Sequence, residues 1–390
     1  MTYYDRALAI NEEIIKARRY LHAHAEVGVD LPESMAYITS VLESFGLRSE
    51  RCGCGVVCTV GDGEKSVLLR ADADALPITE ESGESFASIY ENAAHCCGHD
   101  VHSAMLLGAA KILSEKREKL RGKVVFMFQA GEELLLGCRD MISAGLLTRF
   151  SPSAAFAVHT AAGKIEPGVY MYNAGGVMMR SADVFEIDVF GKGGHASYGS
   201  ASDPIRAGCR IYDYAVAVPS LCGAAEKAAV TVGRFSSGRA GNVIPNHASL
   251  GGSIRCADNI LRESLRDALK SGIEDIARKG ECRAEINFTA AVPTLTCDEK
   301  LTQFARKCIE NCGVPWSGSK DDISVPASDD FALLAERVPS VYVYLSAGFA
   351  DSRGDHTAHD AAMQINEAVC AMGSAVYAAF AEEYLMCEQK

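Results

Sequence analysis

The chain has 390 residues, of which 48% are hydrophobic and 23% charged, and its formal net charge is −13. This length suggests two domains with a sizeable buried core, and the acidic balance argues against nucleic acid, which needs a basic face. No apolar run approaches the ~20 residues needed to cross a bilayer, and the polar, amphipathic start predicts no signal peptide.

Patterns typical of strands alternate with helical patterns along most of the chain. Apolar positions recur at helical spacing in residues 5–24, 34–46, 102–119 and 137–147. Short, apolar, β-rich runs occupy residues 66–72, 123–129, 153–159 and 340–346. Strands that are apolar almost throughout, with helices between them, predict an α/β fold with a mostly parallel sheet covered on both faces.

The pattern changes from about residue 182, where a second domain is expected. An alternating strand is followed by a helix, two strands, a charged amphipathic helix and a last strand, at residues 183–191, 203–218, 228–235, 247–256, 258–279 and 282–289. This βαββαβ order is that of a ferredoxin-like unit. The chain then returns to helix, strand and a terminal helix near 361–385. We therefore expect one discontinuous domain, residues 1–181 and 292–390, interrupted by another, residues 182–291.

Fifteen cysteines are scattered along the chain without paired repeats at zinc-ribbon spacing. This usage favours reduced thiols in a cytoplasmic protein, most of them small core residues, over a disulfide framework.

Several polar side chains follow the ends of predicted strands. They are Asp72 and Asp74, Glu132 and Glu133, His159, and His356 ten residues beyond a strand. In open parallel sheets, ligands bind outside the carboxyl ends of the strands. The turn Cys97–Gly98–His99–Asp100 opens a helix and can face the same edge, so a site assembled from distant segments is expected.

Thiolate, imidazole and carboxylate donors suit zinc, manganese, cobalt or nickel better than magnesium or calcium. The candidate ligands exceed the need of one tetrahedral ion, and two ions about 3.5–4 Å apart would explain the surplus. In the pair Glu132–Glu133, one carboxylate can bind metal while the other accepts a proton from water.

Each of these residues also has a simpler interpretation. A single histidine near a strand end is often a hydrogen-bonded structural residue, and adjacent glutamates often lie in a solvated loop. Asp72 and Asp74 could cap the following turn. Cys96 and Cys97 could form a redox pair, although a vicinal disulfide is strained and nearby His99 favours metal.

Six collinear motifs identify a family resemblance that runs from about residue 18 to the C-terminus. They are RRYLHAHAEVG, LLRADADALPI, HCCGHDVHSAMLLGAA, VVFMFQAGEE, GKGGHAS and NVIPNHASLGGSIR. Together they resemble the amidohydrolase branch of the dinuclear aminoacylase/carboxypeptidase family, which includes hippurate hydrolases, N-acyl-amino-acid amidohydrolases and plant indole-acetyl-amino-acid hydrolases.

The resemblance implies a catalytic domain interrupted by a lid domain that often mediates dimerisation, and a set of site residues. The implied metal ligands, for two divalent ions (Zn, Mn, Ni or Co), are Cys97, His99, Glu133, His159 and His356. Glu132 would be the general acid/base. His195 on the lid would polarise the scissile carbonyl or hold the oxyanion, and Asn242 and Arg255 would bind the substrate's carboxylate, for which arginine's fork is suited.

One departure from the family pattern affects the ligand set. The closing DHTAHDAAM lacks the Pro-x-Phe-Asp that usually follows the histidine, so His356 and His359 are alternatives for the fifth ligand. His356 is preferred because a threonine follows it, as in many relatives.

The resemblance implies metal-dependent hydrolysis of N-acyl-L-amino acids, small molecules with a free carboxylate, by a chain that forms a homodimer through its lid. The alternatives are a dipeptidase or carboxypeptidase with the same dinuclear site, and a non-catalytic binding protein on this fold. A redox-sensing thiol protein built on Cys96–Cys97 is a further alternative. No contact with a membrane is expected.

Overall fold

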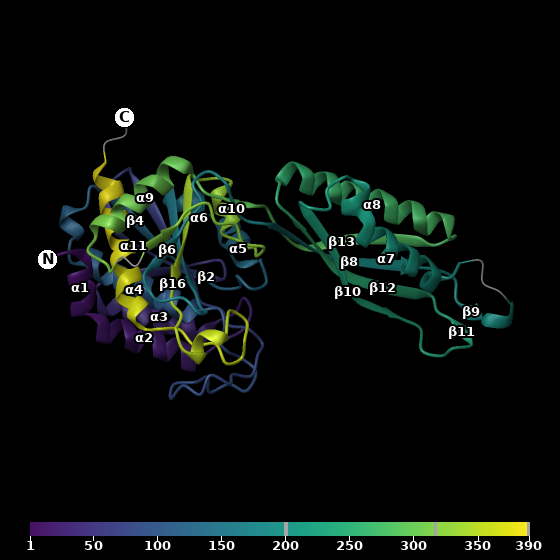
Figure 1. Ribbon diagram of the computed structural model, residues 1–390, viewed down its shortest axis with the longest axis horizontal. Coiled ribbons are helices and arrows are strands. Elements are labelled where there is room, and N and C mark those ends of the chain that lie inside the picture. The colour runs from purple at the N-terminus through teal and green to yellow at the C-terminus, as the bar shows by residue number, and fades with distance from the viewer. Residues whose placement is uncertain (199–201, 316–317, 388–390) are drawn as a thin grey trace. The chain divides into compact units, whose positions relative to one another are not determined.

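The computed structural model describes residues 1–198, 202–315 and 318–387, which form two compact units (Figure 1). The first unit comprises Met1–Met178, Thr296–Ser324 and Asp329–Lys390, and the second comprises Met179–Leu295 and Val325–Ser328. The sequence placed residues 325–328 in the first domain, whereas the structure groups them with the second unit. The reason is local pairing, because Met179 forms a parallel bridge with Val325 and the Arg180 N–H donates to the Ala327 carbonyl.

A mixed eight-stranded sheet forms the centre of the first unit. Its strands are β1 (Ser49–Cys52), β2 (Gly55–Asp62), β3 (Ser66–Asp72), β4 (Gly122–Gln129), β5 (Ala154–Ala161), β6 (Val169–Met171), β15 (Gly318–Lys320) and β16 (Ser340–Ser346). Their order is β1-β2-β4-β3-β5-β16-β6-β15. The four central strands, β4, β3, β5 and β16, run parallel, while β2 is antiparallel to β4 and β6 is antiparallel to β16. The prediction of an α/β fold with a mostly parallel sheet is confirmed.

Helices of the first unit pack on this sheet through apolar faces. They are α1 (Tyr3–Ala9), α2 (Asn11–Ala23), α3 (Pro32–Ser44), α4 (His99–Ser114), α5 (Gly137–Ser143), α6 (Leu146–Phe150), α9 (Glu299–Asn311), α10 (Ala332–Ala335) and α11 (Ala368–Met386). Helices α4 and α11 pack against each other and against β3. Both are buried over nearly their whole length, because small residues and leucines recur on all their faces. Among the described residues, no helix is both long enough and apolar enough for a membrane crossing.

The parallel strands determine where a site can form. Since β4, β3, β5 and β16 are parallel neighbours, their carboxyl ends, at Gln129, Asp72, Ala161 and Ser346, lie at one edge of the sheet. The loops that carry most of the predicted ligands leave the sheet at this edge.

The second unit is a four-stranded antiparallel sheet with two helices. Its elements are β8 (Ser181–Phe190), β9 (Gly194–His195), α7 (Pro204–Leu221), β10 (Ala228–Ser237), β11 (Val243–Ile244), β12 (His247–Cys256), α8 (Asn259–Lys279) and β13 (Arg283–Val292). The sheet order is β10-β12-β8-β13. Alternate residues of β8 (Phe185, Ile187 and Val189) are fully buried in one core with apolar residues of α7 and α8. Asp203 and Asp258 cap the two helices by accepting backbone N–H bonds. The short elements β7 (Val177–Met179) and β14 (Leu295–Thr296) lie where the chain passes between the units.

Several predicted elements differ from the structure in their bounds. The strands expected at 66–72 and 340–346 are confirmed with the same ends, as β3 and β16. The helix expected over 5–24 is instead two helices, because the backbone of Ile10 (φ −115°, ψ 11°) leaves the helical region between them. The hairpin β1–β2 was missed, because its cysteines and glycines obscure the alternating pattern.

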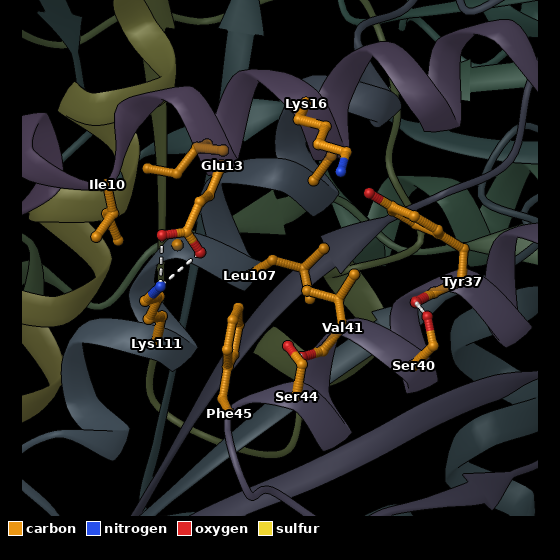
Figure 2. A pocket seen from close by; sticks show the side chains of 13 residues that line it. Ile10, Glu13, Lys16, Tyr37, Ser40, Val41, Ser44, Phe45, Leu107 and Lys111 are labelled. Atoms are coloured by element: carbon orange, nitrogen blue, oxygen red, sulfur yellow. Dashed lines mark hydrogen bonds and ion pairs between the residues drawn. The ribbon is translucent and has the colours of Figure 1, made fainter.

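A groove of about 320 Å³ lies between α2, α3 and α4 (Figure 2). Its floor is apolar, with Ile14, Val41 and Leu107, and the ammonium of Lys111 pairs with Glu13 at its side. Lys111 lies twelve residues after His99, or about 18 Å along the helix. The groove is therefore separate from the edge of the sheet where the predicted ligands lie.

The packing of β5 on α11 predicts a large stability effect at Phe156. This ring is fully buried and stacks on Phe380, with ring centroids 4.2 Å apart. Phe156→Ala should lower the free energy of unfolding by about 3–5 kcal/mol, because it leaves a cavity in a rigid core. Chemical denaturation measures this loss, with Ile89→Ala, at a side chain 65% exposed, as a control that should change stability by less than ~0.5 kcal/mol. Equal effects of the two substitutions would contradict the packing described.

Candidate metal centre

The turn before α4 places two donors at the edge of the sheet. Gly98 is the residue before the helix and has φ +91°, a left-handed conformation that favours glycine. A Cβ at this position would also collide with the Thr160 hydroxyl at the end of β5. The tight approach of this turn to β5 brings Cys97 and His99 beside His159.

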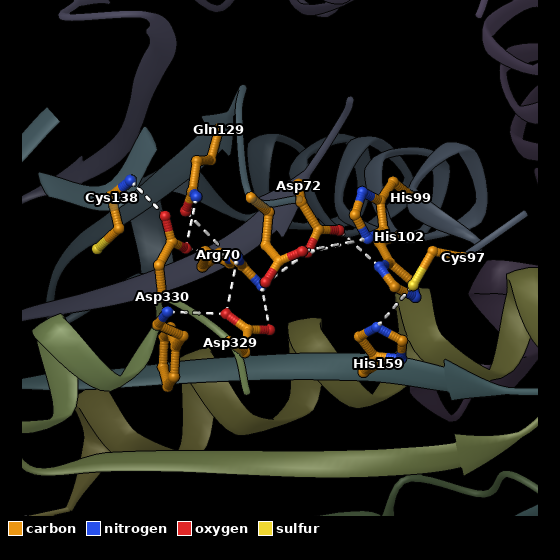
Figure 3. Close-up of polar contacts among 12 residues, drawn as sticks. Arg70, Asp72, Cys97, His99, His102, Gln129, Cys138, His159, Asp329 and Asp330 are labelled. Atoms are coloured by element: carbon orange, nitrogen blue, oxygen red, sulfur yellow. Dashed lines mark hydrogen bonds and ion pairs between the residues drawn. The ribbon is translucent and has the colours of Figure 1, made fainter. Parts of the chain in front are cut away.

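Cys97, His99 and His159 form the first group of donors. Each offers one ligand atom, and these atoms lie within 4.8 Å of one another; Cys97 Sγ is 3.7 Å from His159 Nε2 (Figure 3). The Nδ1–H of His99 donates to the Asp74 carbonyl at 2.9 Å, and the Nδ1–H of His159 donates to the Thr160 carbonyl at 2.7 Å. These bonds fix the tautomers and leave both Nε2 atoms available to a metal.

Cys97, Glu133 and His359 form a second group, again with donor atoms within 4.8 Å of one another. The Nε2 atom of His359 lies 3.6 Å from Glu133 Oε1. The backbone of His359 has φ +70°, and its N–H donates to the Cys96 carbonyl at 2.7 Å. Cys97 belongs to both groups, so five side chains supply two adjacent sets of three donors.

The structure brings His359, and not the preferred His356, to the group of Cys97 and Glu133. His356 Nδ1 lies 3.1 Å from Asp360 Oδ2, and its side chain is 40% exposed. The left-handed turn at His359, tied to Cys96, directs the later histidine toward Glu133. The preference for His356 rested on the threonine that follows it, which does not determine where either ring points.

His102 and Asp72 resemble a further metal site, but their atoms are already engaged. His102 Nδ1 donates to Asp72 Oδ1 at 2.6 Å, and His102 Nε2 accepts the Thr160 backbone N–H at 2.9 Å. Neither ring nitrogen is free, so His102 supports the site without being a ligand. Its ring lies 4.4 Å from that of His159. Burial and this neighbour lower the pKa of His159 well below its usual range, which keeps the ring neutral, the form that binds metal.

Glu132 lies in the same cluster, next to the donors but in a more acidic surrounding. Its side chain is only 7% exposed, and a carboxylate oxygen groups with those of Asp329 and Asp330 as well as with His99 and Glu133. Burial, with the negative charges of Asp329 and Glu133, raises the pKa of Glu132 well above its usual range. A carboxylate with increased proton affinity is suited to accept and return a proton.

The charged network below the site was not expected from the sequence. Arg70 is 2% exposed and contacts Asp329 with both terminal nitrogens, at 3.1 and 3.0 Å, and Asp72 at 2.7 Å (Figure 3). Asp330 accepts from the Gln129 side chain at 2.7 Å and from the Cys138 N–H at 2.9 Å. Arg70 lies within the apolar run of a predicted buried strand, and a buried charge requires charged partners. Its position could therefore have indicated that acidic residues surround it.

The three candidate site residues of the second unit lie in two separate places within that unit. His195 in β9 lies opposite Val243 of β11, and the Ala196 N–H donates to the Asn242 carbonyl at 3.2 Å, so His195 and Asn242 are neighbours. Arg255 is eight residues beyond His247 in β12, about 27 Å along the strand. Its guanidinium donates to the Ser328 hydroxyl at 2.5 Å. The structure thus does not bring Arg255 together with Asn242.

Cys96 differs from Cys97 in its surroundings. Its side chain is 2% exposed, whereas that of Cys97 is half-buried, and burial raises the pKa of both thiols to about 12. A buried, protonated thiol is a poor nucleophile, which does not favour a redox pair. All fifteen cysteines are free in the structure.

Comparison with known proteins shows the family. The family model described as Peptidase family M20/M25/M40 matches residues 68–383. Among curated proteins, N-acetylcysteine deacetylase of Bacillus subtilis (strain 168) is 30% identical, over 96% of this chain and 97% of its own length. IAA-amino acid hydrolase ILR1-like 2 of Arabidopsis thaliana is 34% identical, over 95% of this chain and 85% of its own length.

A solved structure agrees with both relatives. The Bacillus subtilis YXEP protein, described as a dinuclear metal binding peptidase from the M20 family, superposes with a TM-score of 0.79 at 28% identity, covering 97% of this chain and 99% of that one. The family model covers more than half of the chain, and the relatives match it over nearly its full length. The chain therefore belongs to Peptidase family M20/M25/M40, and it is a hydrolase of the amidohydrolase and peptidase type.

Proposed function

We propose that the protein hydrolyses the amide bond of N-acyl-L-amino acids, releasing an acid and an amino acid. The observation that carries this proposal is the pair of donor groups that share Cys97, with buried Glu132 beside them. The names of the two relatives support the substrate class, since one refers to N-acetylcysteine and the other to an IAA-amino acid.

The donors fit two divalent transition-metal ions. His99 Nε2 and Glu133 Oε1 are buried and have no hydrogen-bond partner in the described part of the chain, which is costly unless a cation satisfies them. We assign Cys97, His99 and His159 to one ion, and Cys97, Glu133 and His359 to the other. Thiolate and imidazole favour zinc, manganese, nickel or cobalt over magnesium and calcium. When bound, such ions polarise a carbonyl and lower the pKa of water.

Glu132 would move the proton in this reaction. It accepts a proton from the attacking water and delivers one to the nitrogen of the leaving amine, so that it ends in its starting state. Its burial and the acidic neighbours raise the pKa of Glu132, and Asp329 and Asp330 are held in place by Arg70.

In this proposal the second unit supplies the remaining groups. His195 would stabilise the developing oxyanion and Asn242, its neighbour, would bind the substrate beside it. Arg255 would bind the substrate's carboxylate, and the Ser328 hydroxyl orients its guanidinium. The βαββαβ order and the sheet order β10-β12-β8-β13 support a ferredoxin-like lid.

The second unit also carries a surface that supports a homodimer. Ile205, Cys209, Tyr212 and Val216 recur at helical spacing on the exposed side of α7, each of the three larger ones 38–40% exposed. Strand β10 is an edge strand of the sheet, and unpaired edges favour association. Light scattering of the full chain gives its mass in solution, and a monomer at micromolar concentration would refute this part of the proposal.

The proposed function is tested by assays of hydrolysis with the metal removed and added back. Chelation should abolish hydrolysis of N-acetyl and N-benzoyl amino acids, and a divalent ion should restore it, with up to two ions per chain by elemental analysis. A dipeptidase would instead prefer unblocked dipeptides. Full activity of metal-free protein, or indifference to the acyl group, would contradict the proposal.

The two adjacent glutamates should respond differently to the same substitution. Glu132→Gln keeps the size of the side chain but cannot accept a proton, so kcat should fall ~10²–10⁴-fold with metal content preserved. Glu133→Gln should instead weaken binding of one ion. Measuring kcat and metal content for both variants decides the assignment, and exchanged behaviour would reverse it.

The alternative ligands His356 and His359 can be compared by the same substitution. His359→Ala removes a donor, so the affinity for one of the two ions should fall by at least ~10-fold. His356→Ala, three residues away and half-exposed, should keep both ions. Titration of metal-stripped protein with zinc measures both. Loss of an ion from the His356 variant alone would restore His356 as the ligand.

A further inference from the structure

The motif RADADALP contains a second aspartate, Asp74, that the proposed reaction leaves without a role. Asp74 follows β3 by two residues and is 1% exposed. Its neighbour Asp72 is engaged by Arg70 and His102, but Asp74 belongs to none of the three-donor groups. A buried carboxylate needs hydrogen-bond donors. The donors to Asp74 are backbone N–H groups of the proposed catalytic loop.

Both carboxylate oxygens of Asp74 accept backbone N–H groups of the glutamate pair. The Glu132 N–H donates to Oδ1 at 3.1 Å, and the Glu133 N–H donates to Oδ2 at 3.0 Å. These two amides lie in the loop after β4, fifty-eight and fifty-nine residues further along the chain. The carboxylate therefore fixes the direction in which both glutamate side chains leave the backbone.

The main chain of the same residue holds the other group of donors. The Asp74 carbonyl accepts the Nδ1–H of His99 at 2.9 Å, which sets the tautomer that leaves Nε2 for the donor group shared with Cys97 and His159. Asp74 thus contacts one ligand from each proposed ion site. His99 bonds to its carbonyl, with Oδ1 further away at 3.5 Å from the same nitrogen, and the Glu133 N–H bonds to its carboxylate.

We propose that Asp74 is the positioning residue that joins the two ion sites, and that its side chain acts mainly on the site of Glu133 and His359. This inference rests on the proposed function. A substitution removes the carboxylate but leaves the carbonyl in place. The affinities for the two ions should therefore separate in a variant of Asp74, which general damage to the fold would not produce.

The experiment titrates metal-stripped, full-length protein with zinc, for wild type and for Asp74→Asn. Asparagine has the same shape, but its amide NH₂ cannot accept an N–H, so one glutamate amide loses its partner. We expect one ion to bind as in wild type and the affinity for the other to fall ~10–100-fold. kcat should fall with occupancy of the second site, while KM changes little.

Asp72→Asn is the matched control, since it makes the same chemical change in an equally buried residue of the same motif. Its partners Arg70 and His102 lie outside the glutamate loop, and the proposed ligand beside it is His99 of the other ion site, at 3.8 Å. Asp72→Asn should therefore lower thermal stability and leave the affinity of the Glu133 site unchanged. Equal loss of both ions in Asp74→Asn, or no loss, would overturn the inference. Wild type that binds no ion would instead refute the proposed function.

A measurement on the wild type covers the case in which Asp74→Asn does not fold. The amides of Glu132 and Glu133 should exchange with deuterium as slowly as those of β4, even in stripped protein, because Asp74 and not the metal accepts them. Fast exchange of these amides in stripped protein would overturn the inference.

Discussion

The site depends on one buried arginine. Arg70 lies in the middle of the sheet, fully enclosed, and three carboxylates, those of Asp72, Asp329 and Asp330, contact it. Each carboxylate comes with its own attachment, to His102, to the Tyr342 hydroxyl and to Gln129. The ion pairs therefore join β3, which carries Arg70 and Asp72, to the segment of Asp329 and Asp330 below the metal donors. Removing one partner would leave a buried charge unpaired, which costs more than the pair contributes.

This network leaves more negative than positive charge at the edge of the sheet. One guanidinium faces three carboxylates, and Glu132 and Glu133 add two more within the same cluster. The imidazoles of His99 and His159 lie beside them, with each Nδ1–H donating to a carbonyl. Divalent ions at these donors would supply the missing positive charge and would satisfy His99 Nε2 and Glu133 Oε1, which have no hydrogen-bond partner among the described residues.

The sequence predicted the centre of the fold and most of the site for the same physical reason. Buried parallel strands read as continuous apolar runs, so β3 and β16 were located to the residue, and the polar residues after them had to meet at one edge. The remaining features of the site depend on backbone detail that no sequence pattern records. The positive φ of His359 decides which histidine faces Glu133, and the position of Arg255 along β12 separates it from Asn242. The pairing of Arg70 with Asp329 spans 259 residues and has no periodic signal.

The donors are oriented mainly by the main chain rather than by neighbouring side chains. His99 bonds to the carbonyl of Asp74, His159 to that of Thr160, and the His359 backbone to that of Cys96. Such bonds persist when surrounding side chains change, so the walls of the substrate site can vary while the metal chemistry is retained. The loop of the glutamate pair differs, since its two amides donate to the carboxylate of Asp74 and not to a carbonyl. A change of side chain at Asp74 therefore alters the support of that loop, whereas the bonds of His99, His159 and His359 to carbonyls do not depend on which side chain the carbonyl's residue carries.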